Sequence, residues 1–205
     1  MHPNPAFRTT PRTRNIAFAR ARGFGTLAIN ASDGPLLSHV PFLINDDATA
    51  LDLHLVRSNP ICRMTPTQAV ISVTGPNAYV SPDWYAAEDQ VPTWNYVAVH
   101  LRGTLESLPH EAMHDMLIRQ SAAYESQLAD KVPWTMDKMS EGAAERMMRM
   151  ILPFRMTITA VDGTWKLNQN KDEAARLKAA DHMTSSLGTE QEALAQLMKA
   201  PPADA

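Results

Sequence analysis

The chain has 205 residues, of which 44% are hydrophobic and 20% are charged, a composition typical of a soluble globular protein. This length is sufficient for one large domain with its own buried core. The formal net charge of −3 and the pI near 6.1 exclude a surface that is basic throughout, which duplex nucleic acid binding favours, but they allow a local basic patch.

The single cysteine, Cys62, excludes an internal disulfide and fits a reducing compartment. No stretch approaches the ~20 consecutive apolar residues that a membrane-spanning helix needs. The first residues also lack the charged-then-apolar pattern of a signal peptide. We therefore expect a cytoplasmic protein.

The N-terminal part is predicted to contain an arm and a helix. Residues 1–12 include three prolines and indicate an extended arm. The Arg- and Ala-rich stretch from Arg12 to Arg22 is predicted to be a helix that ends at Gly23. Its arginines are the nearest approach to a nucleic-acid patch in this sequence, but a solvated helix face is the simpler interpretation.

Six segments carry the alternating, β-branched pattern of strands, and most are joined by short turns rich in Gly, Pro, Asn and Asp. They are residues 24–29, 36–44, 51–56, 69–74, 94–105 and 154–161. This order predicts a mainly β, antiparallel barrel or sandwich instead of a parallel βαβ sheet.

Helical periodicity marks an insertion at about residues 108–150, with helices over 111–128 and near 140–150. Its methionines are most simply adaptable filler of a core. Residues 171–182 and 190–199 are predicted terminal helices, and 201–205 a frayed end. We expect residues 1–183 to form the main domain and 184–205 a C-terminal helix and tail.

The fifth strand has an unusual face, because side chains alternate along a strand. One face is an ordinary core face and consists of Asn95, Val97, Val99 and Leu101. The other is aromatic and polar and consists of Trp94, Tyr96, Ala98, His100 and Arg102. This second face suits a planar, charged ligand or a subunit contact, and it is equally compatible with a half-exposed sheet surface.

The stretch Arg57-Ser58-Asn59-Pro60 predicts an anion site. Ser58 or Asn59 can cap a helical turn that starts at Pro60, which would leave backbone N–H groups beside Arg57. A plain capped turn is the simpler alternative, but His54 projects from the strand just before it. Ser38 and His39 lie on another strand and point to opposite faces.

The stretch His110-Glu111-Ala112-Met113-His114 matches the H-E-x-x-H pattern of zinc metalloproteases. Pro109 precedes it, so His110 falls in the first turn of the helix, and no third ligand stands at a recognised spacing. We interpret the match as chance and expect no metal site.

Several blocks occur together in one order: the residues around Ser38, the strand that ends at Gly103, and the stretch Trp165–Asn170, preceded by Pro5-Ala6-Phe7-Arg8 and with the loop at residues 75–85 between them. In this arrangement the chain resembles the PaiB-type FMN-binding negative transcriptional regulators over roughly residues 1–183. The resemblance implies a six-stranded antiparallel FMN-binding split β-barrel, with a helical insertion and C-terminal helices, working as a homodimer.

The resemblance also implies a cofactor site. The phosphate and ribityl end of FMN would be held by Ser38, His39, His54, Arg57 and Asn59. The ring or the subunit interface would lie near Thr93, Trp94, Asn95 and Tyr96. Lys166 and Gln169 would reach the flavin, where a cation near its N1–C2=O edge would stabilise the reduced form.

The function implied by the resemblance is that of a flavin-dependent negative transcriptional regulator, with DNA as a partner on the family label alone, since no helix-turn-helix stands out. An FMN-dependent oxidoreductase or haem-handling split-barrel enzyme is the alternative, with His39, His54 and His100 near the substrate. A dimeric scaffold that has lost the flavin is the third hypothesis.

Overall fold

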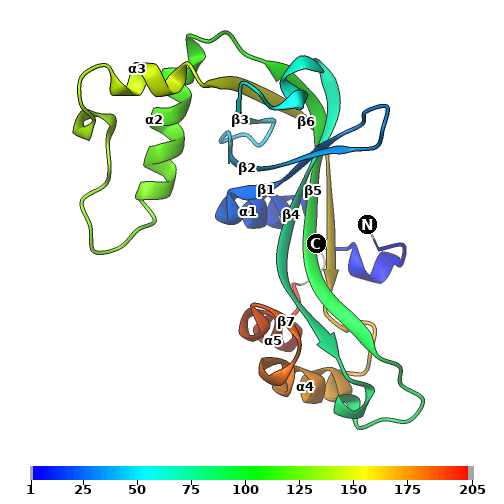
Figure 1. Ribbon diagram of the computed structural model, residues 1–205. Helices are drawn as coiled ribbons and strands as arrows, with labels where there is room; N and C mark the ends of the chain where they lie inside the picture. Colours follow the sequence, from blue (N-terminus) through cyan, green and yellow to red (C-terminus); the bar gives the residue numbers. More distant parts are fainter. Residues whose placement is uncertain (1, 203–205) are drawn as a thin grey trace. The chain divides into compact units, whose positions relative to one another are not determined.

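The structure is a computed structural model that describes residues 2–202 (Figure 1). The chain forms two compact units. Unit 2 contains Ala19–Ser72 and Leu101–Ala160, and unit 1 contains the remaining described residues. Strands β4, β5 and β6 run from one unit into the other. None of the helices between residues 2 and 202 has the length and apolar character needed to cross a membrane.

Six strands close into an antiparallel barrel, as predicted. They are β1 (Phe24–Ile29), β2 (Leu36–Ile44), β3 (Ala50–Val56), β4 (Thr67–Val80), β5 (Thr93–Ser107) and β6 (Ile151–Lys166). Their order is β1-β2-β3-β6-β5-β4, and β1 also pairs with β4, so that Thr26 lies opposite Ser72 and Ile29 opposite Ala69. This second pairing of β1 closes the ring.

Alternating side chains fill the barrel of unit 2. Leu27, Phe42, Leu53 and Ile71 are each at most 1% exposed. Burying such a side chain contributes roughly 1.5–3 kcal/mol, so these positions hold the strands in register. The predicted alternation along β5 is confirmed, because the side chains on the face that includes Leu101 are buried.

Strands β4, β5 and β6 are longer than predicted. In the sequence, Gly75-Pro76-Asn77 has the composition of a turn, yet β4 continues through it. Gly75 is needed there for another reason, since a Cβ at this position would lie 2.6 Å from the ring of Phe18. The glycine therefore marks a close approach of a side chain and not a change of chain direction.

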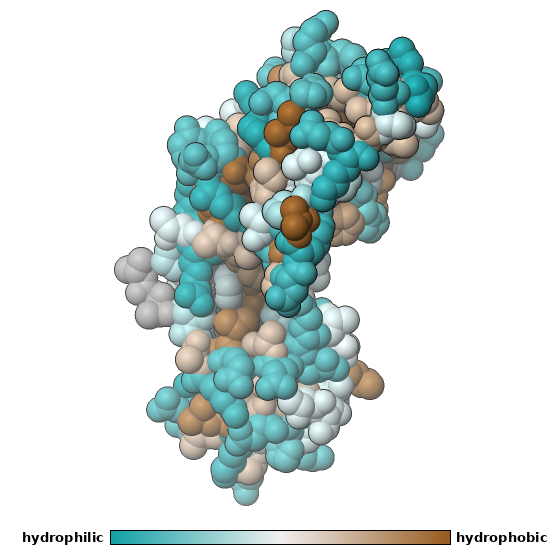
Figure 2. All heavy atoms as spheres, turned by 90° about the vertical axis from the view of Figure 1, so that its left-hand side faces the viewer, coloured by the Kyte–Doolittle hydropathy of each residue, from teal (hydrophilic) through white to brown (hydrophobic). Residues whose placement is uncertain are grey.

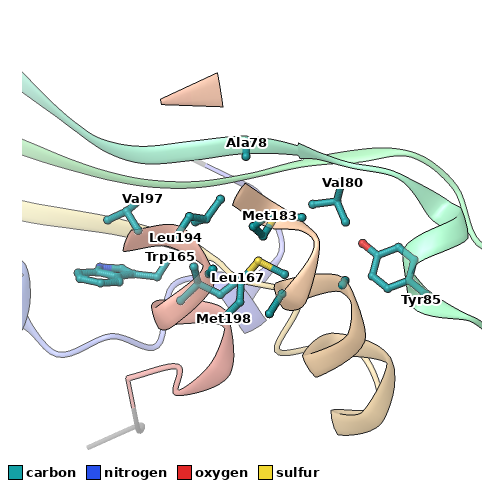
Figure 3. Packing of buried hydrophobic residues seen from close by; sticks show 12 residues of the cluster. Ala78, Val80, Tyr85, Val97, Trp165, Leu167, Met183, Leu194 and Met198 are labelled. Carbon is teal, nitrogen blue, oxygen red and sulfur yellow. The ribbon is translucent and has the colours of Figure 1, made fainter. Parts of the chain in front are cut away.

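Unit 1 has its own apolar core, formed by parts of β4, β5 and β6 and by two helices (Figure 3). Helix α4 (Glu173–Asp181) begins after Asp172, whose carboxylate accepts a hydrogen bond from Ala174 N at 3.1 Å. Helix α5 (Gln191–Lys199) packs with it, and the short strand β7 (Gly188–Thr189) pairs with β4. The side chains of Tyr85, Leu167, Met183, Leu194 and Met198 meet between these elements.

The predicted insertion is helical and belongs to unit 2. It contains α2 (Ala112–Glu125), the turn η4 (Met136–Lys138) and α3 (Ala143–Met148). Tyr124 of α2 places its hydroxyl 2.7 Å from Gly23 O and 2.9 Å from Phe42 O, which ties the helix to the barrel.

The remaining helical segments are the longer helix α1 and four 3₁₀ turns of three or four residues among residues 2–202. Helix α1 (Arg12–Arg22) ends at Gly23, as predicted, where φ is +58°. The N-terminal arm is not fully extended, because it contains the 3₁₀ turn η1 (Pro5–Phe7). The other 3₁₀ turns are η2 (Pro60–Arg63), η3 (Pro82–Tyr85) and η5 (Met183–Ser185). Of the predicted frayed end, residues 203–205 lie outside the described part of the chain.

Candidate functional site

The predicted cofactor residues fall into two sets, one in each unit. The phosphate set lies in unit 2 and consists of Ser38, His39, His54, Arg57 and Asn59. The ring set lies in unit 1 and consists of Thr93, Trp94, Asn95, Tyr96, Lys166 and Gln169.

The structure brings Ser38 and Asn59 together, although they are separated by 20 residues in the sequence. Asn59 Nδ2 donates to Ser38 Oγ at 3.1 Å, and Asn59 Oδ1 accepts from Ile61 N at 3.0 Å. The Asn59 amide is thereby fixed in one orientation. Because the Ser38 oxygen acts as the acceptor in this bond, its hydroxyl proton remains available for another acceptor, such as a phosphate oxygen.

Arg57 stands next to this pair in the sequence, at the end of β3. Its Nε donates to Arg149 O at 3.0 Å, which fixes the guanidinium plane. The terminal nitrogens have no hydrogen-bond or ion-pair partner among residues 2–202, and the side chain is exposed. A guanidinium held in this way matches a phosphate or carboxylate group.

The prediction of free backbone N–H groups at this turn is wrong. The turn η2 is a 3₁₀ helix of only four residues, and Pro60 has no N–H. Ile61 N is bonded to the Asn59 side chain, and Cys62 N donates to Asn59 O at 3.1 Å. The donors of this region are therefore the side chains of Ser38 and Arg57 and not the backbone of the turn.

The two histidines of the phosphate set differ in their surroundings. His39 is exposed on β2, with its ring 6.5 Å from that of Phe24, and Ser38 points to the opposite face, as predicted. His54 is half-buried near Gln120 of α2, and its Nδ1 is buried without a hydrogen-bond partner among residues 2–202. Burial lowers the pKa of His54, and the Gln120 side chain opposes this in part, so the neutral ring is favoured.

In unit 1, Lys166 is the cation of the ring set. Its ammonium group donates to Thr93 Oγ1 and, at 3.0 Å, to Trp94 O. Burial, and then the charge of Lys171, lower the pKa of Lys166. Two of its three protons are therefore assigned to β5, and the group sits at the start of the aromatic face of that strand.

Trp94 is 43% exposed and is oriented by a residue that was not among the predicted site residues. Its indole Nε1 donates to Asn77 Oδ1 at 3.3 Å, and the ring of Tyr79 meets it edge-on at 6.3 Å. Asn77 belongs to residues 75–85, one of the blocks that carry the family resemblance, and no other feature of the sequence pointed to it. In the structure it lies on β4. Tyr96 is half-buried beside this group, and burial raises its pKa.

Asn95 and Gln169 point elsewhere than the rest of the ring set. Asn95 is fully buried on the core face of β5, where its Nδ2 lies 3.4 Å from Met198 Sδ. The Gln169 amide bonds the backbone of Ala6, Trp165 and Leu167. These contacts give both residues positioning roles in unit 1.

The histidines of the H-E-x-x-H stretch are both exposed, and His110 precedes the first residue of α2. No group of three or more metal-ligating side chains was found among residues 2–202. The stretch therefore provides no metal centre within the described part of the chain.

The closed six-stranded barrel defines the structural class of the protein. Among solved structures, the flavocytochrome Anf3 from Azotobacter vinelandii matches with a TM-score of 0.58 and 10% identity, over 80% of this chain and 72% of that chain. The FAD and haem binding protein from Mycobacterium smegmatis matches with a TM-score of 0.56 and 16% identity, over 78% and 73%. At these identities the likeness shows the fold, which is that of the split-barrel proteins.

Sequence similarity identifies the family of the chain within this structural class. It matches the family described as "Putative FMN-binding domain" over residues 1–160, and it belongs to that family. It is also 27% identical to "Protease synthase and sporulation protein PAI 2" of Bacillus subtilis over 197 residues, which cover 94% of both chains. The predicted PaiB-type family is confirmed, and FMN is the cofactor that this family membership assigns.

Each of the two sets, considered by itself, fits one part of a flavin mononucleotide. The phosphate of FMN needs a cation and hydroxyl or amide donors, and Arg57 and Ser38 offer both in unit 2. The flavin ring needs an apolar or aromatic surface and a cation, and Trp94, Tyr96 and Lys166 offer these in unit 1.

Proposed function

We propose that the protein is an FMN-binding homodimer that acts as a negative transcriptional regulator of the PaiB type in the cytoplasm. The observation that supports cofactor binding most directly is the pair formed by Ser38 and Asn59, with the fixed but unpaired guanidinium of Arg57 two residues before Asn59 in the chain. In the proposed site, Arg57 neutralises the phosphate and Ser38 donates a hydrogen bond to it.

The ring set has a separate role in this proposal. Bound FMN supplies reversible one- and two-electron chemistry. Trp94 and Tyr96 would provide the surface on which the ring rests, and Lys166 would place positive charge near the flavin, which favours the reduced anionic form. Thr93 and the Trp94 carbonyl hold the Lys166 ammonium in place for this task.

The regulatory role draws on the family resemblance of the sequence to the PaiB-type regulators. Helix α1 offers little support for direct DNA binding, because its arginines are engaged. Arg20 donates to Asp46 O at 2.8 Å, and the Arg14 guanidinium lies 5.5 Å from the centre of the Trp165 ring. We therefore infer that regulation proceeds through a partner or a metabolite rather than through a basic surface on α1.

An FMN-dependent oxidoreductase or haem-handling protein is the second candidate. It is favoured by the fold that this chain shares with the FAD and haem binding protein from Mycobacterium smegmatis and with the flavocytochrome Anf3. The half-buried, neutral imidazole of His54 is the side chain in unit 2 best suited to such a role.

One purification separates these proposals. We expect the purified protein to be yellow, to show the flavin absorption bands, and to elute from a sizing column with light-scattering detection as a dimer. A colourless monomer that does not bind added FMN would contradict the cofactor and the dimer together. A salt-sensitive gel shift with promoter DNA would support direct regulation, whereas bleaching by NAD(P)H and reoxidation by an acceptor would support the oxidoreductase.

A further inference from the structure

The helical insertion of unit 2 encloses a second candidate ligand site. A strap formed by residues 133–139 faces helix α2, and between them lies a hollow of about 400 Å³. A smaller hollow of about 240 Å³ continues on the α3 side, and both are lined by Ser121, Trp134 and Met136. Cavities for small ligands usually measure roughly 300–1,000 Å³, so the larger one is of sufficient size.

The strap is fixed at one end by a carboxylate. Glu125, at the end of α2, accepts a hydrogen bond from Trp134 N at 2.7 Å and also pairs with Lys131. These bonds, from Lys131 and then from Trp134 N, lower the pKa of Glu125. The indole of Trp134 is thus carried by a segment with a defined position, and the hollow is a built feature of the insertion.

The lining is mainly apolar and remains accessible. Ile118 on α2 is 45% exposed and Met147 on α3 is 64% exposed. Trp134 contributes a flat ring, and Met136 and Met148 contribute polarisable thioethers, which together suit the faces of an aromatic ligand. Figure 2, which shows the side of the molecule that lies on the left in Figure 1, displays such apolar side chains among polar ones.

The charged residues around the larger hollow indicate which class of ligand it can bind. Asp137 is the one acidic residue that lines the larger hollow; His114 also lines it, but neither a lysine nor an arginine does. Its carboxylate has no hydrogen-bond or ion-pair partner among residues 2–202. Neither nearby lysine forms an ion pair with Asp137, since Lys138 donates to Pro133 O at 3.1 Å and Lys131 pairs with Glu125. An aromatic face next to an unpaired carboxylate attracts a cation.

We propose that the hollow between α2 and the strap binds a small aromatic amine in its protonated form. The aromatic body would lie against Trp134 and the methionines, and the ammonium group would face Asp137. This site uses none of the cofactor residues, so the proposal does not depend on FMN binding. It would give the protein a second ligand, as a regulator that responds to a metabolite requires.

The site can be tested on the full-length, FMN-loaded protein with three probes that have the same naphthalene ring system. They are 1-naphthylmethylamine, 1-naphthalenemethanol and 1-naphthoic acid, which are cationic, neutral and anionic at pH 7. With ¹³C-methyl-labelled methionine, the amine should shift the signals of Met136, Met139, Met147 and Met148. The signals of Met183 and Met198, which lie in the core of unit 1, should stay in place. Unchanged signals from the insertion methionines at saturating amine would overturn the proposal.

Variants test the same point by calorimetry. The change Ala122→Trp fills the hollow from an exposed position of α2 and should weaken amine binding by about tenfold or more. The control Ala174→Trp makes the same change at an exposed position of α4 and should bind as the original protein does. The change Asp137→Asn should reduce the preference for the amine over the alcohol by about three- to fivefold. Equal affinity for all three probes, or undiminished binding by Ala122→Trp, would contradict the proposal.

Discussion

At the scale of single residues, the proposed phosphate site depends on two side chains whose orientation is fixed by neighbours. Asn59 holds the Ser38 hydroxyl, and the Arg149 carbonyl holds the Arg57 guanidinium. Ser38 keeps its hydroxyl proton free for another acceptor, and Arg57 keeps both terminal nitrogens free. This organisation lowers the ordering cost of binding an anion, which is the usual reason for a supporting shell of hydrogen bonds.

The change Arg57→Ala should weaken FMN binding by about tenfold or more, because a charge-assisted hydrogen bond contributes roughly 1.5–3 kcal/mol. The dissociation constant can be measured by titrating the apoprotein with FMN and following flavin fluorescence. Arg63→Ala removes a nearby exposed guanidinium at the end of η2 and should leave the constant unchanged. Equal affinities for the two variants would remove Arg57 from the site.

The change Lys166→Met should make the flavin harder to reduce, since it removes the positive charge assigned to the ring set. The measurement is a redox titration of the FMN-loaded protein, with a lower midpoint potential as the expected result. Lys178→Met, on the exposed side of α4, serves as the control. A potential that does not move in either variant would contradict the proposed place of Lys166 beside the flavin.

Sequence reasoning identified residue types at this scale better than their contacts. Opposite faces for Ser38 and His39 and a cap by Ser58 or Asn59 were predicted, because both follow from local backbone geometry, and the structure shows that Asn59 is the cap. Sequence reasoning did not find that Asn77 orients Trp94, or that Gln169 serves the backbone around it. Asn77 and Trp94 are distant along the chain, so no local pattern connects them. The contacts of Gln169 depend on the conformation of the turn after β6, which periodicity does not encode.

At the scale of elements, the main finding is how helix α2 is joined to the barrel. Asp52 on β3 is 4% exposed and accepts hydrogen bonds from Arg155 Nε at 2.7 Å and Arg119 Nη2 at 3.0 Å. Burial raises the pKa of Asp52, but the bonds from Arg155 and Arg119 outweigh it, and the net pKa is lowered. Asp52 alternates with the buried Leu51 and Leu53 along β3, so it lies on the opposite face, where Arg119 of α2 and Arg155 of β6 contact it.

The change Asp52→Asn should destabilise the protein by roughly 1–3 kcal/mol at pH 7, because it removes the carboxylate that both arginines share, while the arginine side chains, 43% and 48% exposed, remain partly hydrated. The free energy of unfolding can be measured with urea. Asp115→Asn removes an exposed partner of Arg119 and should cost less than about 1 kcal/mol.

The original protein and the Asp52→Asn variant should also differ in how their free energy of unfolding depends on pH. The pKa of Asp52 is lower in the folded state than in the unfolded one, so its contribution is fully present above the unfolded pKa of about 4 and disappears as the pH falls through the folded pKa. The difference between the original protein and Asp52→Asn should therefore shrink below about pH 4. A difference that stays constant between pH 7 and pH 3 would show that the charge of Asp52 does not matter.

Strands and helices were largely predictable, because alternation and helical periodicity are local signals. All six barrel strands and the helices at residues 12–22, 112–125, 173–181 and 191–199 occupy the predicted regions. The lengths of β4, β5 and β6 were not predictable, since their continuation depends on packing in unit 1. Gly75 illustrates this. In the sequence a glycine beside proline and asparagine indicates a turn, but in the fold its missing side chain leaves room for the ring of Phe18.

At the scale of the whole molecule, FMN should act as a stabilising ligand. Binding to the folded state alone adds about 2.7 kcal/mol when free FMN is at 100 times the dissociation constant. For a chain of this size, that corresponds to an increase in Tm of about 5–10 °C. Thermal unfolding with and without FMN measures it, and riboflavin, which lacks the phosphate, should give a smaller increase if the phosphate set is correctly assigned.

The order of the strands in the barrel also has a consequence for synthesis of the chain. Strand β6 lies between β3 and β5, although it is encoded about a hundred residues after β3 (Figure 1). Until the ribosome has released Ile151–Lys166, the nascent polypeptide exposes two unpaired strand edges, on which other chains can dock. A fragment that stops before Ile151 should therefore precipitate or bind chaperones, whereas a fragment that ends after Lys166 should have no such open edges on the ring.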